Sequence, residues 1–527
     1  MDTIKDISAF EVVGPIMMGP SSSGTAGMYR IGAAARQFFP GEPSAIDLKF
    51  TPRFGTGYLG CRSHFGLLAG ILGYSIVDER VPQIVQICRD RGIAVTTSMF
   101  RNPLPDHALT VEVTLESTSL TRRLTATSIG GGTIRVDRLN DFPVTLSNQQ
   151  DYCFVLCPAQ SLAQVTALLG SIPYETAVNG SDALAYFAST PAAPLDELRA
   201  LAGEQNVICT QAFIPLGSQP HEPLFTTFEQ LVVLSEQTGK DVAELTIEYE
   251  IGRSGRTRDA IWAQMAEQLQ IMKRAAHAGL TTEIHPLYGY NDGKSGKRLY
   301  AAAQSGRTLG GKTLGTAIAT AMAVMEYSMA LGCIVAAPTG GSAGIVPGAL
   351  LTVQNEHSYS DDQMIRALFV AASVGIIMFY KDVSFSGSQG GCQGEVGVSS
   401  AMAAAALGYL GGGNAATIAN AMALTMKNIL GLICDPLRGC DEVPCIKRNG
   451  IGVANAFSGA DMALAGITSF IPPDEVVDEL LATEKAMPVS MRGCTDESCG
   501  ACNTKTGRVS WATTQAKAQS VILPERE

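Results

Sequence analysis

The stretch that decides the fold of the second half is residues 390–413, GGCQGEVGVSSAMAAAALGYLGGG. Glycines around Cys392 indicate a loop, and the Ala-rich run 401–410 predicts a helix that ends at three glycines. The run is too short and too small in its side chains for a membrane span, so we interpret it as a buried core helix. A Gly-rich loop that carries an unusual residue, followed by an apolar helix, is therefore the repeating pattern that we expect in this half.

In the rest of this half, periodic apolar positions predict a mostly α-helical C-terminal domain. The segments with this pattern are 227–280, 313–334, 362–380, 398–409 and 414–430. The most apolar stretch, 314–338, contains Glu326 together with several Ser and Thr, so we expect a buried core helix there as well.

The N-terminal half has a different pattern, which predicts an α/β (or α+β) domain. Residues 109–116 alternate with period two, and 126–136 indicate a strand, a turn and a second strand. Residues 150–175 predict a strand followed by a helix, as in a small unit of regulatory type. We therefore predict four parts: an α/β domain at 1–145, a small α/β region with a linker at 146–225, a helical catalytic domain at 226–485, and a Cys-containing tail at 486–527.

Composition restricts the function further. Of the 527 residues, 46% are hydrophobic and 17% are charged, which suits a large interior or an obligate oligomer, and we expect a homodimer. The net charge of −11 disfavours nucleic acid as a partner but allows a small anionic substrate. The N-terminus has neither the basic nor the apolar region of a signal peptide, so we expect a cytoplasmic protein without a membrane anchor.

Three cysteines in Gly- and Pro-rich segments are the main chemical signal: Cys392, Cys434 and Cys445. Three thiolates from separate loops can hold a [4Fe–4S] cluster by three of its irons, which leaves the fourth iron free to act as a Lewis acid. The spacing alone is equally compatible with three unrelated buried cysteines. Cys61, Cys88, Cys153, Cys157, Cys209 and Cys333 are scattered or have apolar surroundings, and we interpret them as small buried hydrophobes.

The flanking sequences resemble those of the iron–sulfur-dependent L-serine dehydratases (L-serine ammonia-lyases). The resemblance rests on segments 380–398, 430–436, 443–449 and 336–347 in the second half, and on 14–23, 25–32 and 128–132 in the first. It covers most of the chain and implies that the alpha and beta parts of the family are fused here.

The resemblance implies that Cys392, Cys434 and Cys445 ligate a [4Fe–4S] cluster. It implies β-elimination of water from L-serine or a related β-hydroxy amino acid, which gives a keto acid (pyruvate from serine) and ammonia, as in amino-acid metabolism and gluconeogenesis. Two alternatives stay open: elimination from a cysteine-like or hydroxy-acid substrate, and a non-catalytic cluster that senses redox state or iron.

Two Gly-rich loops are candidates for binding the substrate. Their members are Ser21, Ser22, Ser23 and Thr25 in the first loop and Thr339, Gly340 and Ser342 in the second. Hydroxyls and backbone amides of this kind suit a carboxylate. Serines also cap helices, and both roles can hold because a helix N-terminus is itself an anion site.

The candidates for the catalytic base are Lys381, His64 and Tyr58. Lys381 precedes Cys392 by eleven residues, and a partly buried lysine can have a lowered pKa. The alternative for His64 is an ordinary capping or core histidine.

The chain also departs from the family pattern. Gly24 stands where the family usually has His, residues 57–64 replace a Lys-Gly-His-Gly-Thr type segment, and residues 426–428 replace a Glu-His pair. These changes leave the substrate open. Arg62, Lys427 and Arg438 are extra cations near these motifs, suited either to a second acidic group or to solvent.

Three further cysteines, Cys494, Cys499 and Cys502, lie close together in the tail. One of them is a candidate fourth ligand to the cluster. The alternatives are a separate metal site, a redox-sensitive pair and a surface cluster.

Overall fold

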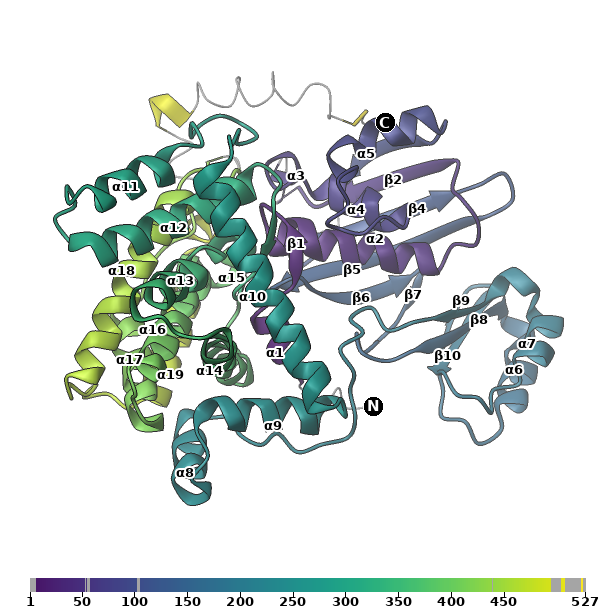
Figure 1. Ribbon diagram of the computed structural model, residues 1–527. Helices are drawn as coiled ribbons and strands as arrows, with labels where there is room; N and C mark the ends of the chain where they lie inside the picture. Colours follow the sequence, from purple (N-terminus) through teal and green to yellow (C-terminus); the bar gives the residue numbers. More distant parts are fainter. Residues whose placement is uncertain are drawn as a thin grey trace.

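The computed structural model describes residues 6–52, 54, 57–101, 105–437, 439–493, 504–507 and 523–524. Helices fill one half of the molecule, and sheets with helices on them form the other (Figure 1). This arrangement confirms the predicted fold class, an α/β N-terminal part followed by a mostly helical part. The boundaries of the four predicted parts stay a prediction.

A six-stranded sheet forms the centre of the N-terminal part, in the order β3-β2-β4-β5-β6-β7. Its strands are β2 (Ala45–Phe50), β3 (Ala94–Met99), β4 (Thr110–Glu116), β5 (Thr121–Gly130), β6 (Thr133–Leu139) and β7 (Phe142–Pro143). Strands β2 and β3 are parallel, and the other neighbours are antiparallel. Gly131 and Gly132 join β5 to β6 with φ of +58° and +87°, which a two-residue hairpin turn requires of its residues. The predicted strand, turn and strand at 126–136 are confirmed.

The helices of this part pack closely because glycines line their contact. These helices are α2 (Met28–Gln37), α3 (Gly57–Gly60), α4 (Ser63–Ile71) and α5 (Ile84–Asp90). A Cβ atom on Gly32 of α2 would lie 2.1 Å from the Leu67 carbonyl oxygen of α4, so the two helices can approach only without it. Before α2 the chain makes a π-helical turn, Ser22–Gly27, a distortion that is frequent at functional sites.

The small region after β7 is a four-stranded antiparallel sheet in the order β11-β8-β10-β9. Its elements are β8 (Tyr152–Pro158), α6 (Leu162–Leu169), β9 (Glu175–Asn179), β10 (Asp182–Ala188), α7 (Leu195–Ala202) and β11 (Val207–Thr210). The predicted strand and helix of 150–175 are β8 and α6. One face of the sheet packs on α6 and α7, and the other contacts the N-terminal domain, where the rings of Phe154 and Phe38 lie 4.9 Å apart.

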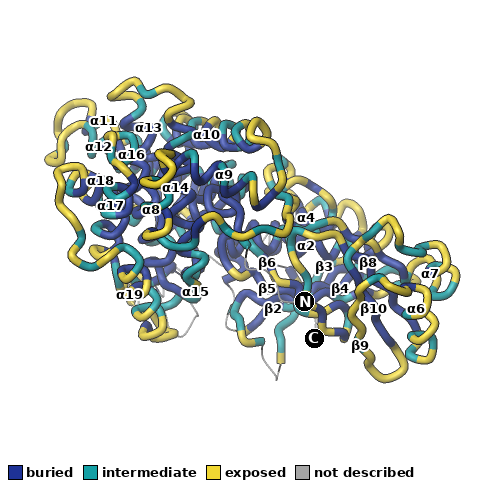
Figure 2. Tube along the Cα trace, turned by 90° about the horizontal axis from the view of Figure 1, so that it is seen from below, coloured by how far each residue is buried: buried dark blue, intermediate teal, exposed yellow. Residues whose placement is uncertain are grey.

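The helical part is built around α14 and α16, which are buried along most of their length (Figure 2). Its helices are α8 (Phe228–Thr238), α9 (Val242–Ser254), α10 (Arg258–Thr281), α11 (Ser295–Gln304), α12 (Gly311–Met329), α13 (Ile345–His357), α14 (Asp361–Tyr380), α15 (Gly387–Gly390), α16 (Val398–Leu410), α17 (Ala415–Lys427), α18 (Cys445–Leu464) and α19 (Pro473–Ala486). By length and composition alone α14 could cross a membrane, but 78% of that window is buried inside the fold, as in a core helix.

The helix expected over 314–338 ends earlier than predicted. Helix α12 stops at Met329, because Leu331 adopts a left-handed φ of +64° and Gly332 follows it. The chain then forms β12 (Cys333–Val335), which pairs with β1 (Ile16–Met18) from the start of the chain. This two-stranded sheet joins the two halves.

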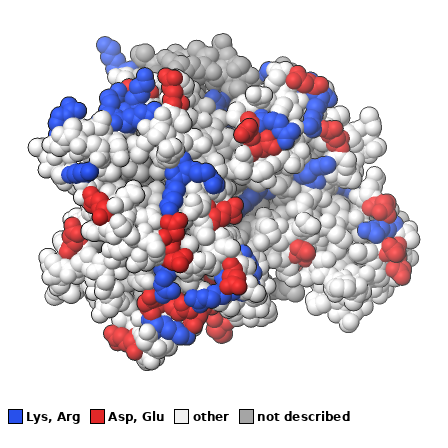
Figure 3. Space-filling model, viewed as in Figure 1, with Lys and Arg blue, Asp and Glu red and all other residues white. Residues whose placement is uncertain are grey.

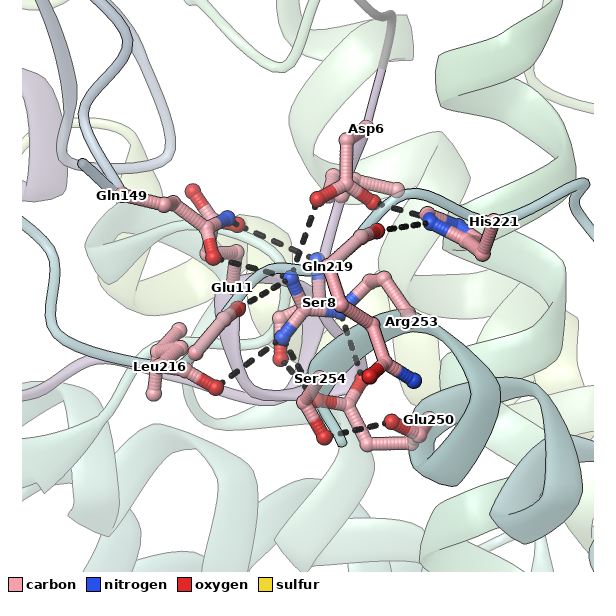
Figure 4. Close-up of polar contacts among 12 residues, drawn as sticks. Asp6, Ser8, Glu11, Gln149, Leu216, Gln219, His221, Glu250, Arg253 and Ser254 are labelled. Carbon is pink, nitrogen blue, oxygen red and sulfur yellow. Dashed lines mark hydrogen bonds and ion pairs between the residues drawn. The ribbon is translucent and has the colours of Figure 1, made fainter. Parts of the chain in front are cut away.

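A buried charge network makes a second connection between the halves (Figure 4). The guanidinium of Arg253, on α9, forms ion pairs with Glu250 at 2.8 Å and Asp6 at 3.0 Å. It also donates to Gln149 Oε1 and to the carbonyl of Gly217. The fully buried arginine thus ties the N-terminal segment, the end of the α/β part and the loop before α8 to one helix. Nearby, α1 (Ala9–Val12) packs on α14.

Acidic and basic side chains lie intermingled over the described residues of the face in Figure 3. Several form ion pairs on the surface, such as Arg258 with Glu244 and Arg366 with Asp241. Exposed pairs of this kind add little stability, so the fold depends on its apolar core and its buried networks.

Candidate active site

Three chain segments bring the predicted cysteines together. Cys392 directly precedes a π-helical turn that leads into α16, and Cys445 is the first residue of α18. Cys434 lies in the loop after α17, where its amide donates to the Met491 carbonyl at 2.9 Å and its carbonyl accepts from Gly493. The three thiols are free and at most 9% exposed.

The sulfurs influence one another. The pKa of the Cys434 thiol lies well above its usual range because it is hydrogen-bonded to Cys392 and buried. Burial, then the charges of Asp441 and Cys392, raise the pKa of Cys445 in the same way. Buried thiols with raised pKa values are costly to ionise unless a cation balances them, which a bound metal does.

A cation of the chain and a carboxylate complete this group. The guanidinium of Arg448 donates to Cys392 Sγ at 3.1 Å and forms an ion pair with Asp435 at 2.8 Å. One oxygen of Glu395 lies within 4.8 Å of the sulfurs of Cys392 and Cys434. The donor set is therefore rich in sulfur, as iron–sulfur clusters prefer.

The absence of a side chain at Gly387 lets the backbone pack directly against these donors. A Cβ atom there would lie 2.7 Å from Cys434 Sγ and 2.6 Å from a carboxylate oxygen of Glu395, so any other residue would displace them. The donor set of three converging free thiols fits a [4Fe–4S] cluster held by Cys392, Cys434 and Cys445.

A cavity of about 100 Å³ opens onto this group, which limits an occupant to a small molecule. Its walls come from both halves of the chain: Ser21, Ser23, Gly24, Phe54, Gly57, Cys61, Ala108 and Leu109 from the first, and Gly341, Ser386, Gly387, Ser388, Glu395, Cys434, Pro436, Gly439, Asp441, Cys445, Arg492 and Gly493 from the second. A site built at such a junction is complete only when both halves are present.

The serine loop caps a helical turn and also lines the cavity, while its binding of the substrate stays a prediction. Ser21 Oγ caps the π-helical turn by accepting from the Gly24 amide at 3.0 Å, and Ser21 and Ser23 both line the cavity. Ser22 and Thr25 are buried, and the Thr25 hydroxyl donates to the Cys61 carbonyl at 2.6 Å. The loop therefore presents two serines to the cavity at the N-terminus of a helical turn, where an anion is stabilised.

Cys61 occupies the space beside Gly24. A Cβ atom on Gly24 would lie 2.5 Å from the Cys61 Cβ, so any side chain at position 24 would collide with this cysteine. Burial raises the pKa of the Cys61 thiol well above its usual range, and its Sγ lies 3.4 Å from the Gly439 carbonyl. The sequence predicted an ordinary buried cysteine; it is buried, but it also forms part of the cavity wall.

The second predicted loop, with Thr339, Gly340 and Ser342, packs beside the cavity, and these three are not among the described residues that line it. The Thr339 hydroxyl lies 3.0 Å from Ser342 Oγ and is hydrogen-bonded to Glu395. Gly340 packs so closely on the first loop that a Cβ would lie 2.8 Å from the Ser22 amide. Gly341, which lies between Gly340 and Ser342 in the chain, lines the cavity. Asn449 of α18 holds this loop by donating to the Gly341 carbonyl at 2.8 Å.

Two carboxyl groups that the sequence analysis did not single out line the cavity. Burial raises the pKa of Glu395 to about 7, against the opposing effects of its Thr339 hydrogen bond and the Arg448 charge. Burial and the nearby Glu395 raise the pKa of Asp441 to about 8. Both groups can exchange protons near neutral pH, which is the property of a general acid or base.

The predicted bases are not among the described residues that line the cavity. The ammonium of Lys381 forms an ion pair with Asp478 at 2.6 Å and donates to the Asp474 carbonyl, so it faces α19. Tyr58 and His64 belong to the hydrophobic layer of the N-terminal domain: Tyr58 stacks on Phe50, and His64 packs edge-on against Tyr58.

Two of the extra cations lie away from the cavity. Arg62 is buried between the rings of Phe65 and Tyr288, and Lys427 pairs with Glu479 at 2.5 Å. Arg438 and the tail cysteines Cys494, Cys499 and Cys502 lie outside the described residues. Arg492 lines the cavity, and its guanidinium donates to the carbonyls of Glu484 and Met487 at the end of α19.

The part of the chain that contains the three cysteines is similar to known proteins. The family described as "Serine dehydratase alpha chain" matches residues 237–499, which include the three converging cysteines, Glu395 and Asp441. The chain is 41% identical over 269 residues to a probable L-serine dehydratase alpha chain of Bacillus subtilis, an alignment that covers 89% of that protein and 51% of this chain.

Two further relatives match in a similar way. The L-serine dehydratase alpha chain of Peptoniphilus asaccharolyticus is 36% identical over 254 residues, which covers 86% of it and 48% of this chain. The L-serine dehydratase of Streptomyces coelicolor is 35% identical over 277 residues, which covers 59% of it and 51% of this chain.

Proposed function

Because the chain belongs to the L-serine dehydratase family, a family of lyases, we propose that it removes water from L-serine to give pyruvate and ammonia. The observation that carries the proposal is a group of three buried free thiols, of which Cys434 and Cys445 line a small cavity that also contains two carboxyl groups of raised pKa. A protein that only transferred electrons would not need such a cavity or such acids.

Cys392, Cys434 and Cys445 would hold a [4Fe–4S] cluster, which supplies Lewis acidity toward the hydroxyl oxygen that leaves the substrate. Arg448 supports the ligand Cys392 through its hydrogen bond to the sulfur at 3.1 Å. Gly387 lets the Cys434 sulfur pack directly against the backbone, where a larger residue would displace it. Hydrogen bonds and packing of this kind tune a cluster as much as the ligands do.

The carboxylate of the substrate would bind at the serine loop. Ser21 and Ser23 line the cavity at the start of the π-helical turn, where amide groups and hydroxyls favour an anion. Arg492 also lines the cavity, and its Nε donates to the Met487 carbonyl at 2.8 Å. The serine loop would therefore bind the acid group of the substrate and orient its α-carbon.

Glu395 and Asp441 would divide the proton transfers between them. With a pKa of about 7, Glu395 is ionised for much of the time at neutral pH and can accept the α-proton. With a pKa of about 8, Asp441 still carries its proton and can donate it to the departing hydroxyl group. The enamine product then tautomerises and reacts with water to give pyruvate and ammonia.

The experiment that tests this function is a product assay on protein reconstituted with iron and sulfide without oxygen. We expect pyruvate and ammonia in equal amounts from L-serine, and slower or no product from L-threonine, L-cysteine and glycerate. Protein that has full iron and sulfide content but forms no keto acid from L-serine would refute the proposal. A faster reaction with L-cysteine would instead assign the site to elimination of a thiol.

A further inference from the structure

The small domain contains a pair of cysteines that lie directly opposite each other on neighbouring strands. In the register of β8 and β11, Cys153 is the partner of Cys209. Directly opposite residues of antiparallel strands point to the same face, with Cα atoms about 4.5–5.5 Å apart. Disulfide bonds join Cα atoms about 4.4–6.8 Å apart, so the pair can be linked without moving the backbone.

The two thiols differ in exposure and are already in contact. Cys209 lies on the edge strand of the sheet and is exposed, whereas Cys153 is buried between the sheet and its helices. The thiol of Cys153 is hydrogen-bonded to Cys209. Together with the charge of Arg199, this bond lowers the pKa of Cys209 to about 7 against the effect of burial. An exposed thiolate beside a buried thiol is the arrangement of an attacking and a resolving cysteine.

We propose that Cys209 and Cys153 form a reversible disulfide when the protein meets hydrogen peroxide, which ties the edge strand β11 to β8. The Cys209 thiolate attacks one peroxide oxygen, the O–O bond breaks, and protonation of the leaving oxygen gives a sulfenic acid and water. The Cys153 sulfur then attacks the Cys209 sulfur, and its proton leaves with the hydroxyl group as a second water. Two thiols lose two electrons, and one peroxide gains them. A dithiol reductant reverses the reaction by exchange.

This site is separate from the candidate active site. Neither cysteine is among the described residues that line the cavity, and both belong to the small domain. The disulfide would close a loop that contains β9, β10, α6 and α7, and so would restrict the opening of the domain. The inference does not depend on the proposed function.

The test is peroxide oxidation of the reduced full-length protein, both with its cluster and without iron, followed by alkylation, trypsin digestion and mass spectrometry. We expect a peptide that links Cys209 to the fragment ending at Arg199, and we expect dithiothreitol to abolish it. That fragment carries both Cys153 and Cys157, so C157S is the matched control and should form the link to the same extent. A link that C157S abolishes, or a Cys209 that stays alkylatable after oxidation, would overturn the proposal.

A second measurement does not require the disulfide to form. Because the hydrogen bond with Cys153 favours the Cys209 thiolate, C153A, which has no donor at this position, should slow the alkylation of Cys209 by iodoacetamide at pH 7 by about threefold, through a smaller thiolate fraction that is partly offset by higher nucleophilicity. In C157A the rate should equal that of the unchanged protein. Equal rates in C153A and C157A would show that the pair does not interact, and would contradict the proposal.

Discussion

A Cβ atom on Gly387 would lie 2.7 Å from the Sγ of Cys434, closer than any real pair of these atoms. Gly387 does not need to be glycine for its backbone, because its φ is not positive. Glycine at this position therefore lets the sulfur pack directly against the backbone. A single methyl group would displace the Cys434 sulfur from the place in which it is proposed to hold the cluster.

The first prediction concerns the replacement of Gly387 by alanine. We expect G387A to lose at least half of its iron and sulfide after reconstitution, and most of its activity, because relieving such an overlap costs about 1–3 kcal/mol. G408A, on buried α16, is the control: its Cβ would meet Ala421 at an ordinary 3.6 Å, so it should bind iron normally. A G387A protein with full iron content and full activity would show that the cluster does not depend on the packing of residue 387 beside Cys434.

The second prediction concerns pH. Glu395 must lose its proton to act as a base, so the rate should rise as pH passes about 7. Asp441 must keep its proton to act as an acid, so the rate should fall as pH passes about 8. A profile of kcat between pH 5.5 and 9.5 should therefore have its maximum between these values.

Variants assign the two limbs of that profile. E395Q should lower kcat by about 10²-fold or more and remove the rising limb, because an amide cannot accept the proton. D441N should remove the falling limb. E479Q, which affects a surface pair with Lys427, should leave the profile unchanged. An E395Q enzyme within threefold of the unchanged protein would exclude Glu395 as the base.

The third prediction compares Glu395 with Lys381, one of the three candidate bases that the sequence suggested. Lys381 pairs with Asp478 on α19, and it is not among the described residues that line the cavity. K381M should therefore keep kcat within about threefold, with at most a small loss of stability, as is usual for a partly exposed ion pair. A loss of about 10²-fold in kcat with normal iron content would show that Lys381 takes part in catalysis.

The fourth prediction concerns the connection between the halves. R253M removes a buried guanidinium and leaves Glu250 and Asp6 without their counter-charge, which should cost about 3–5 kcal/mol in the free energy of unfolding. R258M, which breaks an exposed pair with Glu244, should cost about 0–1 kcal/mol. Urea unfolding compares them, and equal midpoints would show that the network of Figure 4 does not hold the halves together.

Much of the fold was predictable from local pattern. Gly131 and Gly132 marked the hairpin between β5 and β6, and the apolar periodicity located the helices of the second half. The pairing of β1 with β12 was not predictable, because it joins residues more than 300 positions apart and each strand is only three residues long. The left-handed Leu331 that ends α12 early also has no signal in its residue type.

The site was predictable where residue type and flanking motif agreed, and less so where burial decides the chemistry. The convergence of Cys392, Cys434 and Cys445 was expected from the family resemblance of their flanking segments, whereas their spacing alone left it open. Glu395 stands three residues after Cys392, but its raised pKa comes from burial that only the fold creates. Proximity in sequence suggested Lys381, yet the end of α14 directs it toward α19.

The three converging cysteines are proposed to hold the group on which dehydration depends. The most direct measurement is the iron, sulfide and pyruvate formed by C434S beside C88S, which alters a buried cysteine of the N-terminal domain. We predict that C434S loses the cluster absorbance and at least 10²-fold in activity, while C88S retains both. Full activity with L-serine in C434S, or in any preparation without iron, would contradict the account.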